Sequence, residues 1–90
     1  MPYVIVRHKV TNVAEWKPFF DEGVEMRKAA GSETQFVFHN VDDPNDVVIL
    51  LEIDDVEQAR QFGQSSELKD AMKEHGVIGP VERVYLEKME

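Results

Sequence analysis

Alternation of apolar and polar residues predicts the first strand, because Tyr3–Val10 is rich in Val and Ile and has a period of two. Two further strands, Glu33–Val41 and Asp46–Asp54, are predicted on either side of Asp42-Asp43-Pro44-Asn45, a cluster of turn-forming residues. These two strands should form a hairpin. A fourth strand is expected at Val81–Lys88, after the chain-breaking Ile78-Gly79-Pro80.

A helical period connects the first two strands, and it predicts a helix over Val13–Ala30. Asn12 and Glu15 have the spacing of a capping box, and Gly31 is suited to end the helix. One continuous arc of this helix is apolar apart from a single cation; the arc holds Val13, Trp16, Phe19, Phe20, Gly23, Val24, Met26, Arg27 and Ala30.

Two shorter helical pieces connect the hairpin to the last strand. The first begins after Asp54, a suitable cap with Glu57 three residues later, and runs to about Phe62. The second begins at Ser65 and should end at Gly76. The resulting order, βαββαβ, predicts one α+β domain over residues 1–90 with a ferredoxin-like fold, in which a four-stranded antiparallel sheet carries every helix on one face.

The hairpin also predicts which residues face the helices. If Val41 pairs with Asp46, then one face holds Thr34, Phe36 and Phe38 and suits the helices. The opposite face then holds Gln35, Val37, His39, Val48, Leu50 and Glu52.

A sheet face without helices should be polar if it meets water, yet this one is predicted to carry Val37, Val48 and Leu50. A second copy of the chain is the commonest solution to such a face. We therefore expect a homodimer, a dimeric α/β barrel, whose two sheets enclose a pocket for a small apolar or aromatic molecule. The alternative is a structural or interaction dimer, without catalysis, whose interface is filled by its own side chains.

Composition limits the partners of this chain. Ten Lys and Arg against eighteen Asp and Glu give 90 residues a net charge of −8, which disfavours nucleic acid and anionic lipid. The longest apolar run, Val47–Leu51, is far shorter than the roughly 20 residues of a membrane span, and no signal peptide is recognisable, so we expect a cytoplasmic location. There is no cysteine and no phosphate-binding loop, and no cofactor is expected.

Glu52 and His39 are the candidates for acid–base chemistry, since a carboxylate on a central strand or an imidazole in a half-dry pocket can move a proton. A purely structural role for Glu52, bonded to Gln35 or to an arginine such as Arg27, is equally compatible with the pattern. The ligand-binding set is predicted to be His8, Val37, His39, Val48, Leu50, Glu52 and Tyr85.

A metal site built from these residues is not expected within one subunit. Four residues of strand separate Val48, opposite His39, from Glu52, which is about 13 Å at roughly 3.3 Å per residue. Metal ligands must all lie within about 2.2 Å of the ion.

Several motifs along the chain resemble the dimeric α/β-barrel superfamily, and within it the antibiotic-biosynthesis-monooxygenase-like and short cyclase-like proteins. The resemblance covers nearly the whole chain and is carried by Val4-Ile5-Val6-Arg7-His8-Lys9-Val10, Trp16-Lys17-Pro18, Phe20-Asp21-Glu22, Arg27-Lys28-Ala29-Ala30-Gly31, Asp42-Asp43-Pro44-Asn45, Ala59-Arg60-Gln61-Phe62, Ser65 and Leu68.

The resemblance implies the fold and a homodimer, and for an enzyme it implies cofactor-independent oxygenation, cyclisation or isomerisation. The family's monooxygenases use Asn, Trp and Tyr, and its haem-degrading members use Asn, Trp and His. Here the single tryptophan, Trp16, is on the first helix, and the first strand has Arg7 and His8 in place of Asn. No catalytic residue is therefore carried over from the family.

Overall fold

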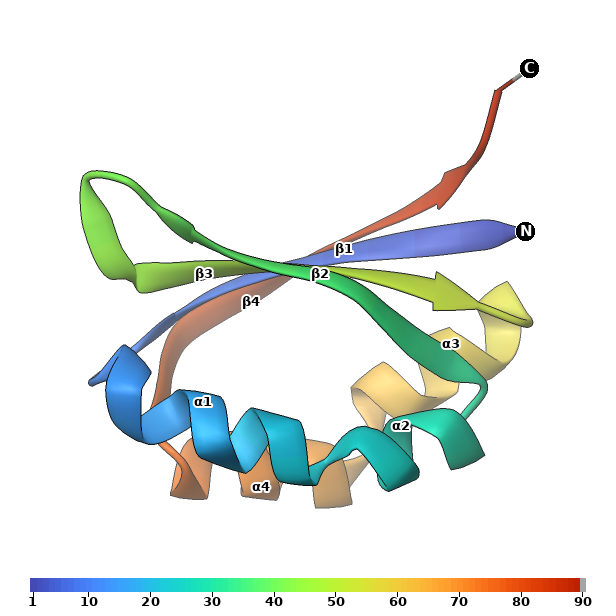
Figure 1. The fold of residues 1–90 in the computed structure, drawn as a ribbon. Coiled ribbons are helices and arrows are strands. Elements are labelled where there is room, and N and C mark those ends of the chain that lie inside the picture. Colours follow the sequence, from blue (N-terminus) through green and yellow to red (C-terminus); the bar gives the residue numbers. More distant parts are fainter. Residues whose placement is uncertain (90) are drawn as a thin grey trace.

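A computed structural model describes residues 1–89, which form four strands and four helices. In chain order the elements are β1 Pro2–Val10, α1 Val13–Glu22, α2 Val24–Ala29, β2 Ser32–Asn40, β3 Asp43–Ile53, α3 Val56–Gln64, α4 Ser66–Glu74 and β4 Val77–Glu87. The sheet is antiparallel with the strand order β2-β3-β1-β4. All four helices lie on one side of it, and the other side is bare (Figure 1). The ferredoxin-like βαββαβ fold predicted from the sequence is confirmed.

Strand pairing divides the side chains of the sheet between two faces. Val4, Val6, His8 and Val10 of β1 share the helix-side face with the β3 residues Val47, Ile49, Leu51 and Ile53. The core lies between this face and the helices, where Trp16 and Phe20 of α1 and Ala59 of α3 complete it. We call the other side of the sheet the open face.

Side-chain caps explain where most helices begin. The Asn12 carboxamide oxygen accepts hydrogen bonds from the amides of Ala14 and Glu15, at 2.9 and 3.3 Å, as the cap pattern predicts. Ser65 caps α4 in the same way. The predicted cap of α3 is wrong by one residue, because Asp55 rather than Asp54 accepts the bond from the Gln58 amide. Gly31 and Gly76 follow α2 and α4 at φ of 80° and 88°, values that glycine adopts without strain.

The single helix predicted over Val13–Ala30 is two helices, because the chain breaks at Gly23. Its amide donates to the Phe20 carbonyl at 3.1 Å, so the last turn of α1 tightens before α2 begins. A β-carbon at this position would lie 2.8 Å from Nη1 of Arg27. Gly23 therefore leaves room for the Arg27 guanidinium.

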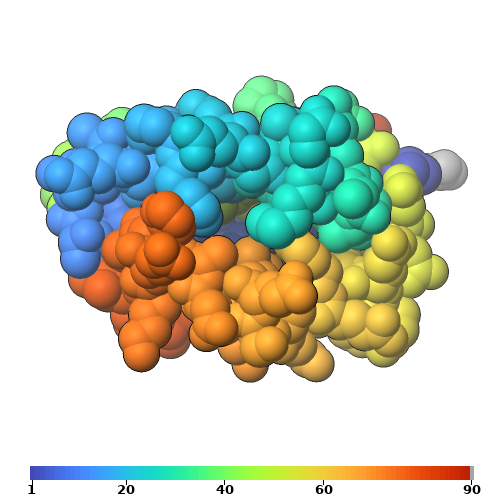
Figure 2. Space-filling view, turned by 90° about the horizontal axis from the view of Figure 1, so that it is seen from below, coloured from blue at the N-terminus to red at the C-terminus, as the bar shows by residue number. Residues whose placement is uncertain are grey.

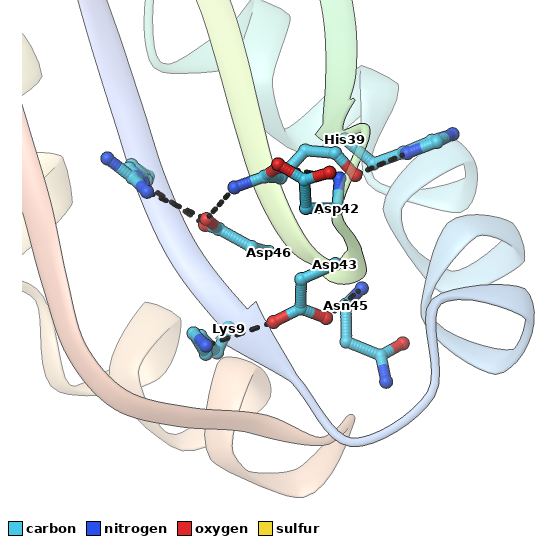
Figure 3. A network of polar contacts seen from close by, with 8 residues as sticks. Lys9, His39, Asp42, Asp43, Asn45 and Asp46 are labelled. Atoms are coloured by element: carbon cyan, nitrogen blue, oxygen red, sulfur yellow. Dashed lines mark hydrogen bonds and ion pairs between the residues drawn. The ribbon is translucent and has the colours of Figure 1, made fainter.

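The predicted register of the β2–β3 hairpin is wrong. Asn40, not Val41, closes the hairpin, and it pairs with Asp43, so β3 begins inside the predicted four-residue turn. The polar side chains explain the tighter turn (Figure 3). The Asn40 side chain accepts a hydrogen bond from the Asp42 amide at 2.8 Å and donates one to the Asp46 carboxylate at 3.1 Å. These two bonds tie the turn and the start of β3 to the end of β2.

A second irregularity lies between Thr34 and Phe36 and shifts the register of β2 again. Since successive side chains of a strand point to opposite faces, a one-residue slip exchanges the faces. Phe36 and Phe38 lie on the hairpin side of this second irregularity, so their register is set by the shift at the hairpin end. They pair with Leu50 and Val48 on the open face, where they are 58% and 52% exposed and stack on each other at 5.7 Å.

The predicted facing of Val37 and His39 is wrong for the same reason, since both were expected on the open face. Val37 pairs with Ile49 and packs against the core, whereas His39 pairs with Val47 and its ring remains exposed near the hairpin. Figure 3 shows the His39 ring turned away from Asp46, with its Nδ1 3.1 Å from the Asn40 carbonyl oxygen.

The last strand begins at Val77, four residues before its predicted start at Val81. Gly79 and Pro80 lie where the pairing of β4 with β1 is irregular, between Arg7 and Lys9. Because β4 is an edge strand, it tolerates a proline without an amide hydrogen at such a bulge.

Candidate functional site

A cavity of about 100 Å³ lies between the helix-side face of the sheet and the helices. Figure 2, which views the molecule from the helix side, shows a groove between the α1–α2 pair and the α3–α4 pair, with atoms of the sheet visible at its floor. We call this space the helix–sheet cavity. Its lining is mostly apolar, and the polar lining residues are His8, Arg27, Ser32, Arg83 and Tyr85.

Aromatic rings from α1 form one wall of the cavity. Trp16 and Phe20, four residues apart on one face of α1, stack with their ring centroids 4.9 Å apart. The edge of the His8 ring meets Trp16 at 5.6 Å, and the Arg27 guanidinium lies 3.8 Å above the centre of the Phe20 ring. A flat aromatic molecule would find complementary surfaces along this wall.

His8 is the buried titratable group of the cavity. His8 is 3% exposed, and its Nδ1 has no hydrogen-bond partner among residues 1–89. Burial lowers the pKa of His8 below its ordinary value of 6.5, and the positive charge of Arg83 acts in the same direction. The ring is therefore neutral at physiological pH and is able to accept a proton.

Two arginines bring positive charge to the same cavity. Arg27 projects from α2 and Arg83 from β4. Arg27 was a possible partner of Glu52, but the structure shows no such pair, because its guanidinium is half-buried over Phe20. Burial lowers the pKa of Arg27, although the group stays protonated.

The predicted ligand-binding residues do not come together at one place. His8 and Tyr85 line the helix–sheet cavity, although the sequence favoured the open face for His8. Val48, Leu50 and Glu52 lie on the open face as expected.

Glu52 and His39, the candidates for acid–base chemistry, are both outside the cavity lining. Glu52 is opposite Tyr3 and Glu33, at the end of β3 away from the hairpin, and His39 is beside the hairpin. In residues 1–89, no group of three or more His, Asp or Glu side chains is placed to hold a metal ion.

Sequence reasoning missed several residues of the cavity. Trp16 was predicted only as part of the apolar arc of the first helix; it is 2% exposed and packs in the core, and it also lines the cavity. For Arg27 the sequence did contain a signal, because it is the one cation within the apolar arc of the first predicted helix. Arg83, like Tyr85, was a possible donor from the last strand, but the facing of β4 could not be read from the sequence. Gly63 gave no signal, because the approach of β4 to α3 depends on long-range pairing.

The comparisons with solved structures identify the fold class. The chain has the fold of the antibiotic-biosynthesis-monooxygenase-like proteins, as its sequence motifs suggested. A protein of this description from Bordetella bronchiseptica superposes with a TM-score of 0.80 at 14% identity, covering 99% of this chain and 97% of that one. SnoaB from Streptomyces nogalater, a cofactor-independent oxygenase, gives a TM-score of 0.71 at 13% identity over 99% and 93% of the two chains.

A conserved protein from Methanosarcina mazei is similar to the same degree, with a TM-score of 0.70 at 17% identity over 98% and 92% of the chains. No protein-family model and no curated protein sequence matches the chain. At these identities the similarity establishes the fold alone. Within residues 1–89, none of the helices is both long and apolar enough to span a bilayer.

Proposed function

We propose that this protein binds a small aromatic molecule in the helix–sheet cavity. The observation that carries the proposal is the cavity itself, an apolar space walled by stacked aromatic rings and supplied with a few polar groups. An apolar cavity of roughly 150 Å³ accommodates benzene, and this one, at about 100 Å³, is smaller, so a single aromatic ring would extend from the cavity into the groove. This location replaces the pocket between two sheets that the sequence suggested.

Homodimerisation through the open face is the second part of the proposal. The open apolar patch, defined as Ile5, Phe36, Phe38, Val48, Leu50, Val84 and Leu86, is continuous across all four strands of the sheet. Four of its members, Phe36, Phe38, Val84 and Leu86, are at least 36% exposed. Soluble monomers rarely leave so many large apolar side chains together on one face, and a two-fold contact with a second copy covers them.

Oxygenation of the bound aromatic without a cofactor is the activity that the cavity supports best, and the name of the Streptomyces nogalater protein describes the same activity. The neutral ring of His8 would accept a proton from a phenol or an acidic C–H group of the ligand. The electron-rich anion left behind can transfer electrons to molecular oxygen. A ligand-binding protein without catalysis is the alternative, and oxygen uptake distinguishes the two.

Binding is tested by nuclear magnetic resonance, because Trp16 is the single tryptophan and its indole N–H gives one resonance at the cavity wall. Small aromatic probes, beginning with benzoate and phenol, should shift that resonance. Ala59→Leu places a larger side chain in the cavity lining and should abolish the shift. Ala29→Leu makes the same change on the exposed side of α2 and should leave binding intact. A wild-type indole resonance that stays unmoved by every probe would overturn the proposal.

Catalysis is tested separately with an oxygen electrode and a panel of phenols and enolisable aromatic ketones. We expect oxygen uptake that is lost in His8→Gln while probe binding persists. Equal uptake by His8→Gln and the wild type would remove His8 from the reaction.

A further inference from the structure

Two cradled guanidinium groups distinguish the helix–sheet cavity from a simple apolar pocket. A β-carbon on Gly23 would lie 2.8 Å from Nη1 of Arg27, and one on Gly63 would lie 2.9 Å from Nε of Arg83. Both glycines adopt negative φ values, so backbone conformation does not require glycine at either position. What each glycine provides is space for an arginine side chain against a helix.

Neither arginine has an anionic partner among the residues that the structure describes. The ion pairs within residues 1–89 are Arg7–Asp46, Lys9–Asp43 and Lys17–Asp21, and they leave Arg27 and Arg83 out. Nε of Arg27 is buried without a hydrogen-bond partner in the described part of the chain. No Asp or Glu belongs to the cavity lining that the structure describes.

This arrangement runs against the composition of the chain. A protein with a net charge of −8 has eighteen Asp and Glu side chains with which to neutralise two cations, yet none of those within residues 1–89 lines this cavity. Both arginines are partly buried, and a partly buried charge without a partner still loses some of its hydration without compensation. The packing of Arg27 on the Phe20 ring compensates for only part of that cost.

We propose that the ligand of the helix–sheet cavity is an aromatic organic anion, with its ring against Trp16 and Phe20 and its carboxylate between Arg27 and Arg83. This inference rests on the proposed binding function and adds the charge of the ligand to it. A carboxylate accepts hydrogen bonds from guanidinium groups in two parallel contacts, which are stronger than contacts between neutral groups. The apolar wall excludes water from these contacts and strengthens them.

Benzoate and benzamide form a matched pair of probes, because they have the same shape and differ in charge. Each is titrated against the full-length chain at neutral pH and low salt, with the Trp16 indole resonance as the readout. We expect benzoate to bind about 10- to 100-fold more tightly than benzamide, as for other hydrogen bonds to charged groups. Arg27→Met and Arg83→Met should each remove most of that preference without weakening benzamide binding.

Lys28→Met is the control, because Lys28 adjoins Arg27 in the sequence but is exposed and outside the cavity lining. It removes the same charge and should leave the preference unchanged. An equal loss in Lys28→Met and Arg27→Met would reduce the effect to net charge and overturn the inference.

The outcomes separate this inference from the proposed function. If benzamide binds as tightly as benzoate, the cavity still binds aromatic molecules and only the anionic ligand is refuted. If neither probe moves the resonance, the binding function itself is refuted. The comparison of the two probes on the wild-type chain needs no variant, so a failure of an arginine variant to fold leaves the test intact.

Discussion

Phe38→Ser tests the role of the open face in dimerisation. Phe38 is 52% exposed, lies on the edge strand β2 and contacts Phe36 at 5.7 Å between ring centroids. A phenylalanine side chain buries about 200 Å² when fully covered, so about 100 Å² of Phe38 is free to be buried by a partner. At about 25 cal/mol per Å², this surface contributes roughly 2.5 kcal/mol per copy, whereas half of the free energy for burying a whole side chain gives about 0.8–1.5 kcal/mol.

Two-fold symmetry doubles that loss, because both copies carry the substitution. The dimer should therefore weaken by about 1.5–5 kcal/mol, which raises its dissociation constant by about one to three and a half orders of magnitude. The monomer should lose only the stacking with Phe36, about 1 kcal/mol, because the Phe38 ring is already half exposed.

Sedimentation equilibrium over a concentration series measures the dissociation constant, and urea unfolding measures the stability of the monomer. Val41→Ser is the matched control, since Val41 is 90% exposed in the hairpin turn and outside the open apolar patch. Leu50→Lys, near the middle of the same patch, should disrupt the dimer more strongly and yield monomers that aggregate or unfold. A Phe38→Ser protein that dimerises as tightly as the Val41→Ser protein would refute the assignment of this face.

Three further predictions concern pH and the glycine cradle. The pKa of His8 in the folded protein lies below 6.5, so the unfolded chain binds this proton at a higher pH than the folded chain. The free energy of unfolding should therefore be unaffected by His8 above pH 6.5 and should fall as the pH drops from there toward the folded-state pKa. Urea unfolding at a series of pH values should show this decrease in the wild type and not in His8→Leu. The ion pair with Arg7 lowers the pKa of Asp46 from 3.8 to about 2, so the stability it provides is present above pH 3.8 and is lost between there and about pH 2. Asp46→Asn should flatten acid unfolding in that range, and an unchanged acid limb would contradict the assignment. Gly63→Ala should change the free energy of unfolding by no more than about 1 kcal/mol, because alanine favours the helix. It should nevertheless weaken benzoate binding, because the added β-carbon displaces the Arg83 side chain. Unaltered benzoate binding would argue against a role for the space that Gly63 leaves beside Arg83.

The sequence by itself determined the order of elements and the fold. Caps and stops such as Asn12, Ser65, Gly31 and Gly76 act within a few residues, and each one is in place in the structure. Periodicity is equally local, and the four strands and the helical segments were found from it. Given that order, right-handed connections leave few arrangements other than a ferredoxin-like sheet.

Tertiary structure alone decided which side chains face the cavity. The register of β2 on β3 depends on the hairpin end, where Asn40 bonds to Asp46, and a slip of one residue there was enough to exchange the faces of Phe36 and Phe38 with those of Val37 and His39. Arg83 meets Gly63 only because β4 and α3 pack together in the folded chain. Local patterns specify elements because their physics spans one turn or one strand, whereas a site built from four elements exists only once long-range pairing has brought them together.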